Sequence, residues 1–203
     1  MVDAARRRDA GETVPDGHWL HRTGDRDPAR ILYTEAQIRT RVSEMAAEIT
    51  GFYPAGEELL VLGLLKGSFI FLADLVRGID RPLHVDFIVA SSYGTGTTSS
   101  GNVRLLYDPM APITGRHVLL VEDIVDSGNT IDYLYTVLKT RRPASIKTCV
   151  LTQKVGKAVE THIDYLGFEI PDVWVVGYGL DFAERHRTWP FIAELKQEAY
   201  VEG

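Results

Sequence analysis

Two continuous apolar runs constrain the fold of this chain more than any other feature of its sequence. ELLVLGLL spans residues 58–65 and HVLLVEDI spans residues 117–124, and in both the apolar residues follow one another without polar alternation. Such runs are typical of strands that are buried on both faces, as in a parallel sheet covered by helices. Both runs are far too short to cross a bilayer, so no membrane partner is expected.

Helical and strand patterns alternate along most of the chain. Helices are predicted from Thr34, where Thr34 and Gln37 have capping-box spacing, at residues 69–79, and around Ile131, Leu134 and Leu138. Further strands are predicted at 83–90, at 102–108, at 146–152 and at 173–179. This alternation predicts an α/β fold with a mostly parallel, doubly wound sheet flanked by helices.

The length of 203 residues suits one domain with a substantial core, which we expect at residues 31–203. Residues 1–30 are polar and without periodicity, so they predict a flexible N-terminal extension. A secretory signal requires an apolar segment after its basic residues, and none follows the basic residues at 6–8, so no secretory signal is expected here. The net charge of -6 argues against an extensive nucleic-acid-binding face.

The single cysteine and two of the histidines receive structural interpretations. Cys149 lies in the apolar run IKTCVL and is expected to be a small buried hydrophobe. A chain with one cysteine fits a reducing compartment, so a cytoplasmic location is expected. His84 and His162 are expected to be structural or exposed.

Chemically active residues gather after the second apolar run, in VLLVEDIVDSGNT at 118–130. In open α/β sheets, ligands bind at the carboxyl ends of the strands, where Glu122 and Asp123 are expected. The next turn offers hydroxyls, backbone N–H groups and a helix N-terminus, which favour a phosphate. Acids beside a phosphate site suit ribose hydroxyls, so the segment predicts a ribose 5-phosphate site. Its residues are Glu122, Asp123, Asp126, Ser127, Gly128, Asn129 and Thr130. In the alternative interpretation, Asp126 only caps the next helix.

This segment resembles the phosphoribosyl pyrophosphate-binding motif of the type I phosphoribosyltransferases, and its S-G-N-T ending resembles the bacterial hypoxanthine-guanine enzymes. The resemblance covers about residues 31–200 and implies the type I phosphoribosyltransferase fold with a small hood. It implies purine salvage: transfer of 5-phosphoribosyl from phosphoribosyl pyrophosphate to N9 of hypoxanthine and/or guanine, giving IMP or GMP and pyrophosphate. It also implies Mg²⁺ as cofactor, a homodimer or homotetramer, and no nucleic acid partner. Asn129 stands where animal relatives commonly carry lysine.

The resemblance assigns roles to further residues. Pyrophosphate-binding residues are implied to be Lys66, Gly67, Ser92, Tyr93 and Arg187, with a non-proline cis peptide in the loop LLKGSF at 64–69. The tract SSYGTGTTSSG implies a flexible lid near 91–103 that closes over the site.

For the base, the resemblance implies that Lys154 donates to the 6-oxygen, Trp174 stacks on the purine and the main chain of Val175 reads its edge. Asp126 is implied to take the N7 proton as a catalytic general base. Metal ligands are implied to be Asp181, Glu122 and Asp123. Without the resemblance, both lysines would be interpreted as solvated strand ends, and Trp174 as a core residue.

Two other functions remain open at this point. The enzyme could prefer xanthine or guanine, because selectivity at the purine 2-position depends on loop geometry. The chain could also be an RNA-binding regulator with the same fold. That function needs an extensive basic face, which 22 basic residues with a cluster only at 6–8 do not predict.

Overall fold

The computed structural model describes residues 28–93, 102–156 and 162–201. The elements in chain order are β1 (Pro28–Tyr33), α2 (Glu35–Phe52), β2 (Leu59–Leu65), α3 (Phe69–Gly78), β3 (Leu83–Tyr93), β4 (Asn102–Tyr107), β5 (His117–Val125), α4 (Asn129–Lys139), β6 (Ser145–Lys154), β7 (Tyr165–Ile170), β8 (Val175–Val176), β9 (Ile192–Leu195) and α5 (Glu198–Val201). No helix in these described ranges is long and apolar enough to cross a membrane.

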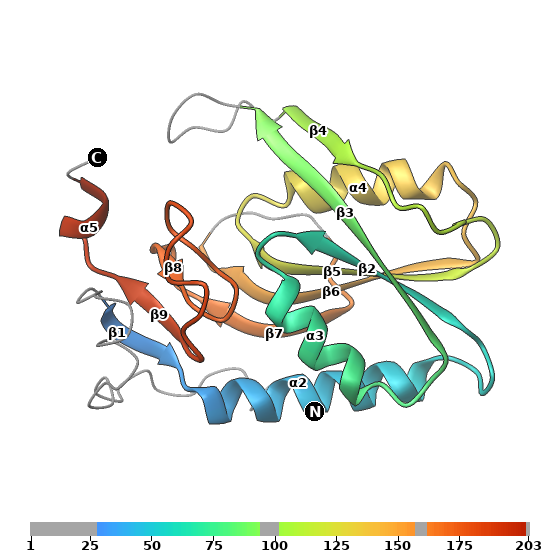
Figure 1. The fold of residues 1–203 in the computed structure, drawn as a ribbon, viewed down its shortest axis with the longest axis horizontal. Helices are drawn as coiled ribbons and strands as arrows, with labels where there is room; N and C mark the ends of the chain where they lie inside the picture. Colours follow the sequence, from blue (N-terminus) through green and yellow to red (C-terminus); the bar gives the residue numbers. More distant parts are fainter. Residues whose placement is uncertain (1–27, 94–101, 157–161, 202–203) are drawn as a thin grey trace.

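A six-stranded sheet forms the centre of the molecule, with the order β4-β3-β2-β5-β6-β7. All neighbours in it pair in parallel except β3 and β4, which pair antiparallel. Helix α4 covers one face, and α2 and α3 cover the other (Figure 1). The predicted parallel α/β sheet is therefore confirmed, with helices on both faces as parallel sheets require.

The two apolar runs form the central strands β2 and β5, and both are buried on the two faces of the sheet. Leu60 and Leu62 of β2 belong to the core cluster on the α4 side, whereas Val61 belongs to the cluster of α2 and α3. At Gly63 a Cβ atom would lie 2.5 Å from Cδ2 of Leu72, so this glycine lets α3 pack closely on the strand.

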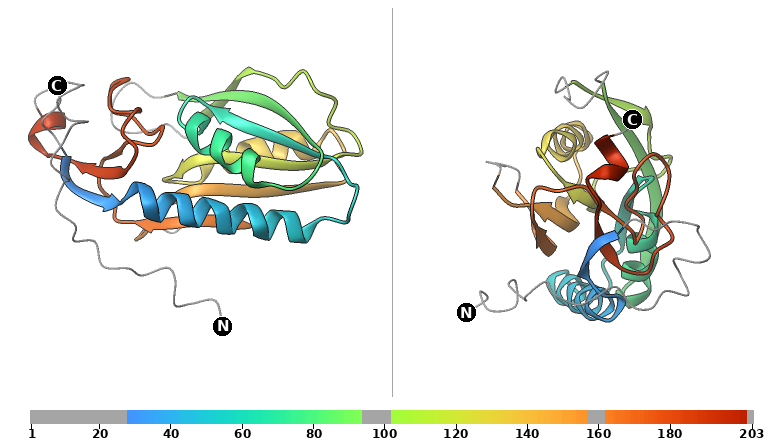
Figure 2. Two further views of the ribbon diagram at one scale, coloured as in Figure 1. Left: turned by 60° about the horizontal axis from the view of Figure 1, so that its bottom comes forward. Right: turned by 90° about the vertical axis from the view of Figure 1, so that its left-hand side faces the viewer.

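A separate three-stranded sheet, with the order β1-β9-β8, lies beyond the carboxyl ends of the parallel strands (Figures 1 and 2). The prediction that residues 173–179 form a strand of the main sheet is wrong. Only Val175–Val176 is a strand, and it pairs antiparallel with β9. Gly177, Tyr178 and Gly179 all have positive φ (97°, 51° and 100°), which ends the extended conformation.

Several described elements have no counterpart in the sequence-based prediction, namely β1, β7, β9 and α5. Strand β1 begins at Pro28, so residues 28–30 of the predicted extension are part of the small sheet. The remaining residues of that extension, and residues 94–101 of the predicted lid, lie outside the described residues. The described ends of that lid segment are the paired strands β3 and β4.

Three structural interpretations of individual residues are confirmed. Cys149 is fully buried, and burial raises the pKa of its thiol. His84 is exposed, and His162 is exposed beside Asp164, with 3.1 Å between Nε2 of the histidine and Oδ1 of the aspartate.

The predicted capping box of α2 is confirmed and provides a test of local stability. The backbone N–H of Gln37 donates to Oγ1 of Thr34 at 3.3 Å, and the N–H of Thr34 donates to Oε1 of Gln37 at 2.8 Å. Thr34→Ala should lower the free energy of unfolding by about 1 kcal/mol, measured by urea titration, because the N–H of Gln37 loses its acceptor. Ser43→Ala, within the same helix, should change it by less than about 0.5 kcal/mol. Equal losses in the two variants would contradict this account of the cap.

Candidate functional site

A cavity of about 280 Å³ lies where β5 leads into α4. It is lined by Val103, Glu122 and residues 124–131. The N-cap residue of α4 is Gly128, which has a left-handed φ of 82° and no side chain that could cap the helix. The interpretation of Asp126 as the cap is therefore wrong. A helix that begins on a glycine presents its first N–H groups to whatever occupies the turn, which suits an anion.

The two adjacent acids at the end of β5 are sheltered from solvent. Glu122 is 6% exposed, and among the described residues its Oε2 atom has no hydrogen-bond partner. Burial, and next the charge of Asp123, raises the pKa of Glu122 well above its ordinary value. Burial also raises the pKa of Asp123 to about 6, although backbone hydrogen bonds and Arg187 oppose the rise. A ligand hydroxyl or a cation at this place would give Oε2 of Glu122 the partner that it lacks among the described residues.

Two loops and the end of β5 meet at Gly67, the residue that follows Lys66 after β2. A Cβ atom on Gly67 would lie 1.7 Å from Oδ2 of Asp123. On the other side, a Cβ atom on Gly179, which has a φ of 100°, would lie 2.1 Å from the Gly67 carbonyl oxygen. Only glycine allows this approach. The Leu65–Lys66 peptide bond is cis, as the resemblance implies.

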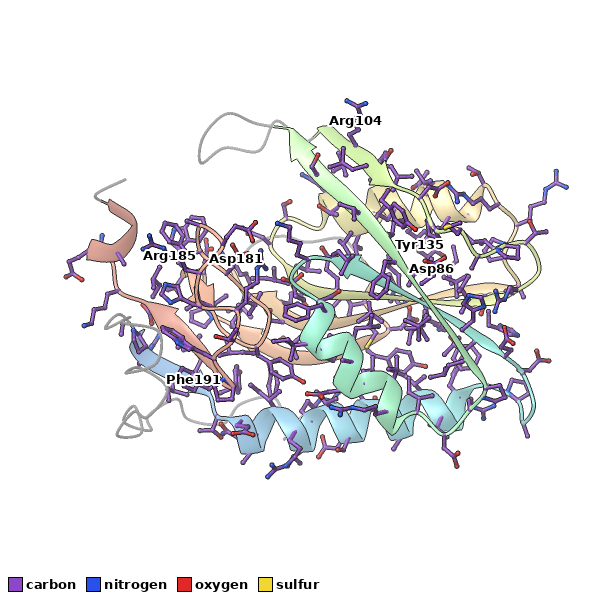
Figure 3. The ribbon with its side chains drawn as sticks, viewed as in Figure 1. Asp86, Arg104, Tyr135, Asp181, Arg185 and Phe191 are labelled. Carbon is purple, nitrogen blue, oxygen red and sulfur yellow. The ribbon has the colours of Figure 1, made fainter. Side chains whose placement is uncertain are left out.

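The predicted pyrophosphate-binding cations lie in the same region and share a carboxylate. Nζ of Lys66 lies 2.9 Å from Oε1 of Glu184, and Nη2 of Arg187 lies 3.1 Å from Oε2 of the same residue. Arg187 also contacts Oδ1 of Asp181 at 2.8 Å and donates to the carbonyl of Gly179 at 2.8 Å. Figure 3 labels Asp181 in the loop that follows β8. The sequence-based prediction did not include Glu184, although it lies inside the segment that carries the resemblance.

The residues predicted for the base gather at the ends of β5, β6 and β8. Nζ of Lys154 lies 3.4 Å from Oδ2 of Asp126, 3.1 Å from Oδ1 of Asp172 and 5.9 Å from the centre of the Trp174 ring. Trp174 is 43% exposed, with its edge against Phe182 at 5.4 Å between ring centres, so it is not a core residue. A flat, half-exposed aromatic ring beside an ammonium group can accept a planar heterocycle. Asp172 and Phe182 were not predicted as members of this group.

The positions of the other predicted residues say little about their roles. Val175 is buried as the first residue of β8. Ser92 and Tyr93 are the last residues of β3, and their backbones pair with Val103 and Asn102. Ser127, Asn129 and Thr130 line the cavity beside Gly128.

The carboxylates of Asp181, Glu122 and Asp123 fit a magnesium ion only if a bound ligand supplies further oxygen atoms. Within the described ranges, no group of three or more His, Cys, Asp or Glu residues could hold a metal ion. Asp181 and Asp123 are close enough to influence each other electrostatically, and Glu122 has an unpartnered carboxyl oxygen. Magnesium in proteins is commonly held by one or two carboxylates together with phosphate oxygens and water, which these acids can match.

A parallel sheet with helices on both faces, a second small sheet beyond its strand ends, a turn that suits an anion and a half-exposed tryptophan are features of an α/β protein that handles nucleotides. Residues 30–183 match the family described as "Phosphoribosyl transferase domain". The chain belongs to the phosphoribosyltransferase family.

This chain matches three similar proteins over nearly the full length of each. The hypoxanthine-guanine phosphoribosyltransferase of Dictyostelium discoideum is 46% identical over 84% of this chain and 97% of its own. The hypoxanthine phosphoribosyltransferase of Haemophilus influenzae is 44% identical over 83% of this chain and 96% of its own. A solved structure of the hypoxanthine phosphoribosyltransferase of Trypanosoma cruzi has a TM-score of 0.80 at 45% identity, covering 87% of this chain and 96% of that one.

The raised pKa of Glu122 predicts that this residue costs stability at neutral pH. Below the ordinary carboxyl pKa of 4.5 the group is protonated in the folded and the unfolded chain alike. Above pH 4.5, Glu122 ionises in the unfolded chain but stays protonated in the folded chain. The free energy of unfolding therefore falls as the pH rises. Glu122→Gln should therefore be more stable than the wild type by about 1–3 kcal/mol at about pH 8, with little difference at about pH 4.

Urea titrations at the two pH values measure this difference. Glu44→Gln is the control, because Glu44 is an exposed glutamate in an ion pair with Arg41 and its effect should depend little on pH. A margin for Glu122→Gln that stays constant across this pH range would contradict the account.

Proposed function

We propose that this chain transfers 5-phosphoribosyl from phosphoribosyl pyrophosphate to N9 of hypoxanthine and guanine, releasing pyrophosphate. The gathering of Lys154, Asp126 and the exposed Trp174 beside the anion-binding turn is the observation that carries this proposal. The relatives named as hypoxanthine(-guanine) phosphoribosyltransferases at 44–46% identity support it.

The ribose 5-phosphate occupies the cavity at the start of α4. Its phosphate accepts hydrogen bonds from the N–H groups of the turn at 127–130 and from the hydroxyls of Ser127 and Thr130. Glu122 and Asp123 accept hydrogen bonds from the vicinal ribose hydroxyls, which supplies the buried oxygen of Glu122 with a partner. Lys66, Gly67 and Arg187 hold the diphosphate, and Ser92 and Tyr93 approach it from the end of β3.

The base lies on Trp174, with its 6-position toward Lys154. The ammonium group of Lys154 can only donate hydrogen bonds. It can therefore bind the 6-oxygen of hypoxanthine or guanine, but not the 6-amino group of adenine. The main chain of Val175 contacts the edge of the base. Asp126 takes the N7 proton as N9 attacks the anomeric carbon, and the leaving diphosphate takes the bonding electrons.

Asp181, together with Glu122 and Asp123, would hold Mg²⁺ against the ligand oxygens. When bound there, the ion neutralises negative charge on the diphosphate. We further propose that the chain acts as a homodimer or homotetramer, as the resemblance implies.

A spectrophotometric assay with magnesium and phosphoribosyl pyrophosphate tests the proposal directly. Hypoxanthine, guanine, xanthine, adenine and uracil are supplied in separate reactions. Turnover with the first two, and little with adenine or uracil, is the expected result. Dominant turnover of xanthine would change the substrate and keep the mechanism. Tight binding of phosphoribosyl pyrophosphate without turnover of any base would support the RNA-binding regulator instead.

Asp126→Asn provides the test of the general base. The amide cannot take a proton from N7, so kcat should fall roughly a hundredfold or more. Binding of phosphoribosyl pyrophosphate should stay within about twofold of the wild type, because other residues hold that ligand. An unchanged kcat would remove Asp126 from this role.

Trp174→Ala tests the platform for the base. Loss of stacking should raise the KM for hypoxanthine about tenfold or more, since stacking on an aromatic side chain contributes about 1–3 kcal/mol per base. Trp174→Phe retains a flat ring and should keep most of the affinity. The initial-rate assay above measures both variants, and equal KM values for the two would exclude the platform.

A further inference from the structure

The carboxylate of Glu184 bridges the two cations that the proposed function gives to diphosphate. Its Oε1 atom lies 2.9 Å from Nζ of Lys66, and its Oε2 atom lies 3.1 Å from Nη2 of Arg187. The two contacts use different oxygens of one group, as two oxygens of a diphosphate would. Lys66 follows β2 and Arg187 follows β8, so Glu184 links two loops that are distant in sequence.

The backbone of the loop aims this carboxylate at the two cations. Ala183 and Glu184 have φ values of 50° and 64°, in the left-handed region that non-glycine residues rarely adopt. The N–H of Glu184 donates to Oδ2 of Asp181 at 2.8 Å, which anchors the turn. Arg187 is fixed from its other side by the carbonyl of Gly179. Such backbone conformations persist where the surroundings impose them, and they cluster at functional sites.

Stability does not explain the arrangement. The side chains of Lys66 and Glu184 are 68% and 64% exposed, and ion pairs at such exposure contribute little to folding. The carboxylate of Glu184 contacts both cations at the place where a diphosphate would put its own charge.

We propose that Glu184 is an internal counter-anion of the diphosphate site, which occupies Lys66 and Arg187 until diphosphate oxygens displace it. This inference rests on the proposed function, which assigns the two cations to diphosphate. Binding is then an exchange of one anion for another. The exchange weakens the affinity for pyrophosphate and favours its departure, because Glu184 takes back the two cations as the product leaves.

Calorimetric titration of the full chain with inorganic pyrophosphate in magnesium-containing buffer tests the exchange. Glu184→Gln keeps the shape of the side chain and removes its charge, so pyrophosphate no longer competes with a carboxylate. Its Kd for pyrophosphate should fall about three- to tenfold, as expected for the loss of two exposed ion pairs. The KM for phosphoribosyl pyrophosphate should fall in the same direction, while kcat should not rise.

Two further variants separate direct competition from a general effect of charge. Glu44→Gln removes one exposed, arginine-paired charge on α2, and its Kd for pyrophosphate should equal that of the wild type. Glu184→Asp keeps the charge in the loop but is one methylene shorter, so it cannot reach both cations. Its Kd should lie between those of the wild type and Glu184→Gln.

Each result supports or overturns the counter-anion. An equal or weaker affinity of Glu184→Gln for pyrophosphate overturns it, as does a Kd of Glu184→Asp equal to that of the wild type. If the wild type turns over hypoxanthine and binds pyrophosphate while the variants show no tightening, only this inference fails. If the wild type neither binds pyrophosphate nor turns over any base, the proposed function fails and the inference fails with it.

Discussion

The site depends on a pair of carboxyl groups at the end of a strand that is buried on both faces. Strand β5 lies between β2 and β6, and its position buries Glu122 and partly buries Asp123, directly after the buried apolar residues of the strand. Two adjacent acids in such a place are costly, since burial raises both pKa values. The cost is tolerable because the acids lie near the carboxyl end of the strand, where ligand hydroxyls and cations can reach them. The stability of the fold and the chemistry of the site therefore oppose each other at these two residues.

Close packing around these acids brings the remaining parts of the site together. Gly67 approaches the Asp123 carboxyl group so closely that no side chain fits between them, and Gly179, in the loop after β8, packs against Gly67. The loop after β2, the end of β5 and the loop after β8 thus form one unit. The small sheet positions the loop that carries Asp181, Glu184 and Arg187, which explains how 203 residues place groups from distant segments within a few ångströms.

The parts of this structure that the sequence predicts are those that depend on local signals. Continuous apolar runs predict β2 and β5, and the spacing of Thr34 and Gln37 predicts the start of α2. The segment 173–179 is equally apolar, but positive φ values after Val176 and pairing with β9 remove it from the main sheet. Local periodicity does not reveal which distant segment a strand pairs with, and for this reason the sequence did not predict β1, β7 and β9. The ion pair between Lys66 and Glu184 spans 118 residues, and for the same reason no spacing signal could reveal it.

Every predicted ligand-binding cation in the site contacts a carboxylate of the chain itself. Lys66 contacts Glu184, Arg187 contacts Asp181 and Glu184, and Lys154 contacts Asp126 and Asp172. Such pairing allows a chain with a net charge of -6 to present a site for phosphates without an extensive basic surface. A ligand gains affinity only if its oxygens match the cations better than the internal carboxylates do. Selectivity therefore depends on the geometry of the ligand oxygens, not on the overall charge of the ligand. A polyanion without that geometry, such as RNA, would meet cations that are already paired, and this argues against the RNA-binding regulator more directly than the net charge does.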